Sequence, residues 1–155
     1  HGRRSRHRPL AEAIRDLSLS PRRDLHELFR RVVASVALGN TDDHLRNHGF
    51  LASRGSWTLS PAFDVNPNPD PMARRSTSIA GADTFPEETE GLLALAEDCS
   101  ITRESARERI GAVVDHLAPW RECARSNRLS EHDITMMAEA IAPRLEALGK
   151  AARAR

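Results

Sequence analysis

A run of apolar residues with helical spacing places the strongest constraint on how this chain can fold. From position 25 the apolar residues recur at the i, i+3, i+4, i+7, i+8 and i+11 steps of an amphipathic helix, at Leu25, Leu28, Phe29, Val32, Val33 and Val36. Gly39 follows, and glycine is the usual residue in the left-handed conformation just past a helix C-terminus. The pattern predicts a buried core helix over 24–38 and an abrupt loop after it.

The segment that follows this helix is rich in side chains that carry chemistry. Within residues 40–47 an acid, an imidazole and an amide stand at Asp42, His44 and Asn47, and Asp64 comes 17 residues after Asn47. Such groups can accept a proton and ligate a divalent cation. A loop anchored on a buried helix end holds them in a defined geometry. We interpret the rest of the chain as scaffold for this loop.

Two short apolar segments after the loop, 49–52 and 57–59, have the composition of strands. The four residues between them include Gly55, which supplies the positive φ angle of a hairpin connection. A hairpin brings its far end back beside its start. We therefore expect Asp64 to return to the neighbourhood of Asn47.

The remaining segments are mostly helical by the same criteria. Apolar spacing and capping residues predict helices over 9–17, 88–97, 102–117 and 130–149, the last kinked at Pro143, and a weak third strand at 76–79. We expect one domain of the mainly α (α+β) class, a helical bundle with a small β-hairpin beside the loop. Its expected parts are a basic, flexible end (1–8), the core helix (24–38), the polar loop (40–47), the hairpin with its acid (49–64) and a helical subdomain (88–148).

Composition narrows the class of protein. A length of 155 residues with 39% hydrophobic residues is sufficient for one domain with its own core. The net charge of +1 gives no reason to expect nucleic acid or an anionic membrane as the main partner. No apolar stretch reaches the roughly 18 residues of a membrane span, so we expect a cytoplasmic protein. Cys99 and Cys123 lack metal-ligand spacing, and we interpret both as buried thiols.

The distribution of cationic residues is unusual. Residues 1–8 are strongly basic and contain no aromatic residue, which is typical of a frayed end or a connector and less often of a phosphate-contacting arm. Of the 23 Lys and Arg residues only Lys150 is a lysine, and it lies in the tail. A phosphate group bound near the loop therefore has no nearby lysine in this chain.

The polar residues follow an order that phosphoryl transfer uses. A carboxylate receives the proton of the attacking hydroxyl, and oxygen ligands hold Mg²⁺ on the phosphates. Protein kinases space these groups as Asp-x-x-x-x-Asn, with a second Asp after a short hairpin. Asp42, Asn47 and Asp64 occur in this order. An alternative stays open, in which Asp42 caps a turn, Asn47 bonds the backbone and Asp64 begins a proline-rich loop.

The sequences of two segments, 39–51 and 59–67, resemble those of the HipA family of bacterial serine/threonine protein kinases. In that family an Asp-x-His-x-x-Asn catalytic loop precedes a Pro-x-[Tyr/Phe]-Asp element. Residues 42–47 match the first motif, and residues 61–64 match the second. The resemblance implies a protein-kinase-like C-terminal lobe, and more weakly it extends over the helices on both sides.

The resemblance also implies roles for single residues. Asp42 is the expected catalytic base, and Asn47 and Asp64 are the expected Mg²⁺ ligands for bound ATP. His44 is expected to stabilise charge on the transferred group, or else to hold the loop through a backbone carbonyl. Asp43 is expected at the loop surface.

A kinase of this family also has an N-terminal lobe, with a phosphate-covering loop and a lysine. No G-x-G-x-x-G motif occurs in this chain. The resemblance therefore implies that this chain is the C-terminal lobe alone. Such a lobe can be a fragment, a processed chain or one part of a split kinase. We expect almost no kinase activity without the missing lobe. The implied partners are a protein substrate, such as a translation component, and the DNA-binding antitoxin of a toxin–antitoxin pair.

Two readings from other classes stay open. One is a non-catalytic interaction module that uses the helices after Glu88. The other is a metal-dependent hydrolase, since Asp42, Asp43, His44 and His48 are close in sequence and the two histidines have the i, i+4 spacing of zinc ligands on a helix.

Overall fold

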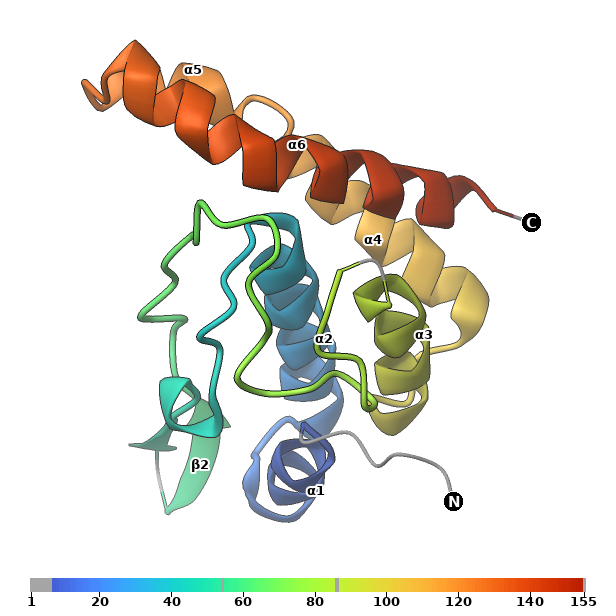
Figure 1. Cartoon of the computed structure of the whole chain (residues 1–155). Helices are drawn as coiled ribbons and strands as arrows, with labels where there is room; N and C mark the ends of the chain where they lie inside the picture. Colours follow the sequence, from blue (N-terminus) through green and yellow to red (C-terminus); the bar gives the residue numbers. More distant parts are fainter. Residues whose placement is uncertain (1–6, 54, 86, 155) are drawn as a thin grey trace.

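The computed structural model describes residues 7–53, 55–85 and 87–154. Within these ranges the chain is mainly helical, with one two-stranded antiparallel hairpin, which confirms the expected class (Figure 1). The elements are α1 (Arg8–Leu17), α2 (Pro21–Ala37), a 3₁₀ turn (Leu45–Asn47), β1 (Phe50–Ser53), β2 (Ser56–Leu59), α3 (Glu88–Asp98), α4 (Arg103–Leu117), α5 (Trp120–Ser126) and α6 (Glu131–Arg153).

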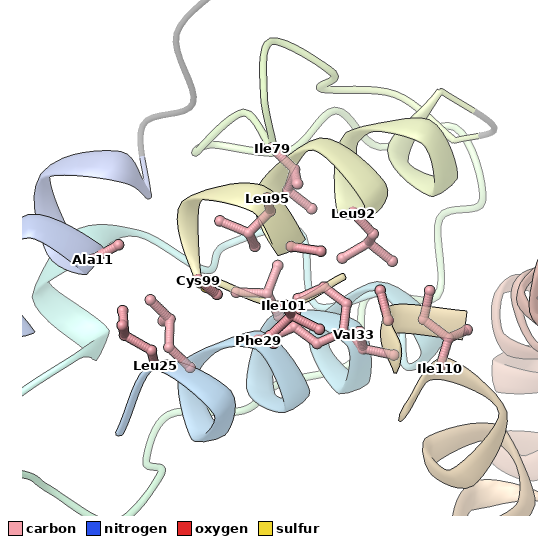
Figure 2. Close-up of a cluster of buried hydrophobic side chains, with 14 of the residues drawn as sticks. Ala11, Leu25, Phe29, Val33, Ile79, Leu92, Leu95, Cys99, Ile101 and Ile110 are labelled. Carbon is pink, nitrogen blue, oxygen red and sulfur yellow. The ribbon is translucent and has the colours of Figure 1, made fainter. Parts of the chain in front are cut away.

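Helix α2 is the centre of the core. Helices α1, α3, α4 and α6 all contact it, and Figure 1 shows α6 crossing the molecule beyond the C-terminal end of α2. The apolar positions that predicted this helix are buried, and Phe29, Val32 and Val33 are completely so. Figure 2 shows Phe29 and Val33 in one cluster with Leu95 of α3 and Ile110 of α4. Burying one such side chain contributes about 1.5–3 kcal/mol.

The C-terminus of α2 ends as predicted. Gly39 has a φ of +68°. Its N–H donates to the Val36 carbonyl (3.1 Å), and the Asn40 N–H donates to the Ser35 carbonyl (2.9 Å), which together form a Schellman motif. This motif turns the chain sharply out of the helix into the polar loop.

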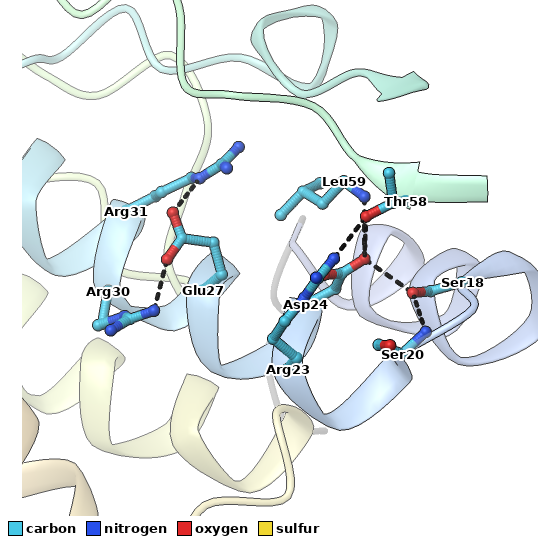
Figure 3. A network of polar contacts seen from close by, with 9 residues as sticks. All are labelled: Ser18, Ser20, Arg23, Asp24, Glu27, Arg30, Arg31, Thr58 and Leu59. Carbon is cyan, nitrogen blue, oxygen red and sulfur yellow. Dashed lines mark hydrogen bonds and ion pairs between the residues drawn. The ribbon is translucent and has the colours of Figure 1, made fainter. Parts of the chain in front are cut away.

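The N-terminus of α2 is tied to the hairpin through a buried carboxylate. Asp24 accepts hydrogen bonds from the backbone N–H of Leu59 (2.9 Å) and the hydroxyl of Ser18 (2.7 Å), as Figure 3 shows. Arg23 lies against the same carboxylate at 2.9 Å. One side chain thus joins the α1–α2 turn, the first turn of α2 and the end of β2.

The hairpin is present and tighter than expected. Phe50 pairs with Leu59 at its open end, and Ser53 already pairs with Ser56, so only two residues connect the strands. Gly55 has the expected positive φ of +78°. The backbone N–H of Leu19 also bonds the carbonyl of Trp57, which holds β2 against the α1–α2 turn.

Several expectations about local structure were wrong. Residues 76–79 form no strand, and Ile79 makes only an isolated bridge with Ala82. Helix α6 does not end at Gly149 but continues to Arg153. The helix continues through Pro143, whose ring leaves the Glu139 carbonyl without its helical donor; Glu139 is exposed, so water can replace that donor.

Two expectations about burial were also wrong. Residues 1–6 lie outside the described ranges, but His7 is completely buried, so the basic end is not frayed throughout. Cys99 is buried, and burial raises the pKa of its thiol to about 12, whereas Cys123 on α5 is exposed. No helix in the described part of the chain is long and apolar enough to cross a membrane.

Candidate active site

The candidate loop is held beside the returning chain by backbone hydrogen bonds. The Ser60 N–H donates to the Gly49 carbonyl (2.8 Å), and the Asn68 N–H donates to the Gly39 carbonyl (3.1 Å). Asp64 lies midway between Ser60 and Asn68. The segment 60–68 therefore runs back along the loop from its end to its start, as the green trace beside the cyan loop in Figure 1 also shows.

Thr41 joins the loop to its neighbours on two sides. Its hydroxyl accepts a hydrogen bond from the Asn68 side chain (3.0 Å), and its carbonyl accepts one from the Ser76 N–H (2.8 Å). Thr41 is buried. The loop is thus a fixed middle layer between two segments that follow it in sequence.

Asp42 and Asn47 are linked through the backbone of the loop. The Nδ2 of Asn47 donates to the carbonyl of Asp42 (3.1 Å), and Asn47 is buried while Asp42 is exposed. We expected an irregular loop here, but residues 45–47 form a 3₁₀ turn. The Asn47 N–H closes it by donating to the His44 carbonyl (2.9 Å). Among the described residues, no hydrogen bond occupies the carboxylate of Asp42 or the Oδ1 of Asn47.

Asp64 is exposed and has a left-handed backbone, with φ of +57°. Its Oδ1 accepts a hydrogen bond from the Nδ2 of Asn66 (2.7 Å). A non-glycine residue in this region is uncommon, and such residues cluster at functional sites. Within the described ranges, Asp64 shares no hydrogen bond with Asp42 or Asn47. The fold therefore places these residues on adjacent segments without joining their side chains directly.

His44 follows Asp42 in a tight turn, in which the His44 N–H donates to the Asp42 carbonyl (2.9 Å). The ring is partly buried, and within residues 7–53, 55–85 and 87–154 its buried Nδ1 has no hydrogen-bond partner. No hydrogen bond from this ring to a backbone carbonyl is found in the described part of the chain. The alternative in which His44 holds the loop by such a bond is therefore not supported.

Asp43 is not at the loop surface, as we expected, but buried with 5% exposure. Its Oδ1 lies 3.0 Å from His48 Nε2, and its Oδ2 lies 3.8 Å from His7 Nε2 and 3.7 Å from an Arg75 nitrogen. Burial opposes its ionisation, but the hydrogen bond with His48 and the nearby imidazole of His7 outweigh this and hold the pKa of Asp43 far below its ordinary value. Asp43 is therefore a buried, ionised carboxylate.

A chain of buried charges continues from Asp43 into the helices. Arg75 donates to one Glu88 oxygen and Arg144 of α6 to the other, each at 2.7 Å. Arg75 also donates to Ser35 (3.1 Å). Sequence reasoning missed this network, because its members come from five separate parts of the chain and share no spacing.

His7, Asp43 and His48 bring their ligand atoms within 4.8 Å of one another. Two imidazoles and a carboxylate form a donor set that zinc accepts. However, the carboxylates of Asp43 and Glu88 already lie against the guanidinium groups of Arg75 and Arg144. A divalent cation here would leave uncompensated positive charge in the interior, which is costly.

The alternative with His44 and His48 as a zinc pair on a helix is not supported by the structure. Residues 44–48 do not form the helix that this spacing requires, and the three-residue cluster contains His7 in place of His44. Burial lowers the pKa of His7 and outweighs the opposing effect of Asp43, so its imidazole is neutral at pH 7. We interpret the cluster as a hydrogen-bonded part of the protein interior.

Comparison with known proteins relates this geometry to a family. The sequence model of the family described as "HipA-like C-terminal domain" matches residues 3–120. This chain belongs to that family. The match includes the loop, the hairpin, Asp64 and Glu88, whereas Arg144 and the rest of α6 lie beyond it.

A curated relative is consistent with a kinase family. Over 56 residues the chain is 41% identical to a Haemophilus influenzae protein named "Putative kinase". The match covers 35% of this chain and 16% of that protein, so the chain corresponds to only a small part of the relative's length.

Proposed function

We propose that this chain is the catalytic C-terminal lobe of a HipA-like serine/threonine protein kinase, which transfers the γ-phosphoryl group of ATP to a protein hydroxyl. The observation that carries the proposal is the pair of backbone bonds, Ser60 to Gly49 and Asn68 to Gly39, that brackets Asp64 against the loop. The alternative in which Asn47 only bonds the backbone agrees with its hydrogen bond to the Asp42 carbonyl, but it does not account for the position of Asp64 beside the loop. Family membership supports the same function.

Asp42 is the proposed catalytic base. Its carboxylate is exposed and holds no hydrogen bond within the described part of the chain, so it can receive the proton of an incoming hydroxyl. His44 follows two residues later, and its Nδ1 has no hydrogen-bond partner among the residues that the structure describes. We propose that this imidazole stabilises charge on the transferred group.

Asn47 and Asp64 are the proposed Mg²⁺ ligands, and their donor atoms fit this ion. The amide nitrogen of Asn47 is occupied by the Asp42 carbonyl, which leaves its Oδ1 as the available donor. Asp64 accepts through Oδ1 and keeps a second carboxylate oxygen. Oxygen donors of this kind suit Mg²⁺, which when bound with ATP would neutralise charge on the phosphates.

Further proposals follow from the resemblance to HipA kinases. An N-terminal lobe would supply the phosphate-covering loop and the lysine that this chain lacks, because its single lysine, Lys150, lies on α6. The acceptor would be a protein in the cytoplasm, such as a translation component, and a DNA-binding antitoxin would be a partner. Without the other lobe we expect almost no turnover, since the loss of one transition-state contact costs roughly 3 kcal/mol.

The test supplies the polypeptide encoded upstream, or the full-length product, and measures ATP turnover and protein phosphorylation. Asp42→Ala, Asn47→Ala and Asp64→Ala should each reduce turnover by about a hundredfold or more while each variant stays folded, with a cooperative thermal transition. Asp115→Ala, on an exposed face of α4, is the matched control and should be fully active. Wild-type turnover in the Asp42 variant would remove its assignment as base. If the wild-type chain binds the upstream polypeptide but the complex turns over no more ATP than a blank without protein, the non-catalytic module is favoured.

A further inference from the structure

Two consecutive bonds close the candidate loop across its width. The Asn47 side chain bonds the Asp42 carbonyl, and one residue further on His48 Nε2 bonds Asp43 Oδ1. Each bond spans five residues. The orientation of Asn47 therefore depends on its own hydrogen bond to the Asp42 carbonyl. It also depends on the bond to Asp43 that fixes the next residue, His48.

Asp43 is itself fixed from outside the loop. Arg75 lies 3.7 Å from its Oδ2, and Arg75 is held by Glu88, which also holds Arg144. The Arg144 Nε lies only 3.3 Å from the point where a Cβ on Gly39 would stand. The network thus reaches the start, the middle and the end of the loop, and connects it to α3 and α6.

A buried network of this kind is poorly explained by stability alone. Removing four charges from water is expensive, and apolar side chains of similar volume often stabilise a protein as well or better. Partners that orient metal ligands, in contrast, commonly change metal affinity by about 10–100-fold when they are replaced. The position of Asp43, between two proposed functional residues, fits this second role.

We infer that Asp43 is a positioning residue, which holds His48 and thereby sets Asn47 so that its Oδ1 and Asp64 can bind one divalent cation. This inference rests on the proposed function, because it takes Asn47 and Asp64 as ligands. It predicts that the cation site depends on a residue that does not touch the cation.

The test titrates the 155-residue chain with Mn²⁺ alone and follows free Mn²⁺ by electron paramagnetic resonance. Asp43→Asn should weaken Mn²⁺ binding by about tenfold or more. His48→Ala should do the same, whereas His48→Gln, whose amide can still donate to Asp43, should stay within about threefold of wild type. If the Asp43 variant does not fold, the two His48 variants still decide the outcome.

Two controls separate the possible results. Asp64→Asn tests the proposed site directly. A second control tests for a general effect of lower stability: we choose Ile110→Val or Ile110→Ala, according to which one matches the melting temperature of the Asp43 variant. The inference is supported if Mn²⁺ binding is lost in Asp64→Asn, Asp43→Asn and His48→Ala. Binding must also be retained in the Ile110 variant and in His48→Gln.

The other results would overturn it. If Asp64→Asn abolishes binding but Asp43→Asn and His48→Ala bind as wild type does, Asp43 has no positioning role and the proposed site stands. If the Ile110 variant loses Mn²⁺ equally, stability explains the effect. If the wild-type chain binds no Mn²⁺, or Asp64→Asn binds as well as wild type, the proposed cation site fails and the inference fails with it.

Discussion

Asp24 shows how much one side chain can decide in this protein. It is 2% exposed and accepts hydrogen bonds from Leu59 and Ser18, so it joins parts of the chain 35 residues apart. Burial opposes its ionisation, but the bonds from Leu59, Ser18 and Arg23 outweigh burial and lower the pKa of Asp24 below its ordinary value. A carboxylate of this kind stabilises the fold only while it is ionised.

This gives a prediction about acid stability. Because the folded pKa of Asp24 lies below the unfolded one, its contribution is fully present above the unfolded value, near 3.8, and is lost as the pH falls through the folded value. Asp24→Asn should lower the free energy of unfolding at pH 7 by roughly 1–3 kcal/mol. It should also lose less stability than wild type between pH 5 and pH 2. Urea unfolding across this range checks it, with the exposed Asp115→Asn as control, and parallel pH profiles would contradict it.

At the scale of elements, close packing decides which helical glycines can change. Gly91 lies in α3, and a Cβ there would stand 2.4 Å from the carbonyl oxygen of Ile79. Gly111 lies in α4, and a Cβ there would meet Ala152 at an ordinary 3.6 Å. The two positions have the same local preference but different surroundings.

We therefore expect opposite results from the same substitution. Gly111→Ala should stabilise the protein by about 0.5–1 kcal/mol, because alanine favours a helix more than glycine does. Gly91→Ala should destabilise it by about 1–3 kcal/mol, because α3 must move away from the backbone of residue 79. Thermal or urea unfolding of the two variants measures this directly. Equal effects would mean that helix preference outweighs packing.

At the scale of the whole molecule, Glu88 connects regions that no single element spans. It binds Arg75, which reaches the candidate loop, and Arg144, which belongs to α6. All three side chains are at most 2% exposed. Removing Glu88 would take from the buried Arg75 and Arg144 the carboxylate that each of them binds at 2.7 Å.

Glu88→Ala should therefore lower the free energy of unfolding by about 3–5 kcal/mol. Glu97→Ala, which removes a largely exposed glutamate from the same helix, should change it by less than about 0.5 kcal/mol. Urea denaturation provides both values. A small loss in the Glu88 variant would show that the two arginines find other partners or water.

Local chemistry in the sequence determined much of the secondary structure. Helical spacing located α2, and Gly39 ended it because the left-handed conformation there costs glycine little. Thr102 and Ser130 begin α4 and α6 by accepting the N–H groups of Ser105 (3.3 Å) and Asp133 (3.1 Å). The sequence also determined family membership, which the comparison confirmed. The roles of Asp42, His44, Asn47 and Asp64 stay predictions.

Only the tertiary structure decided which charges are buried. Asp43 has the local pattern of an exposed loop residue, yet His7, Arg75 and His48 gather on it from three places in the chain. A spacing rule reads only neighbours a few residues apart, whereas burial depends on every segment that packs around a side chain. For the same reason Gly149, which by pattern ends a helix, lies inside one.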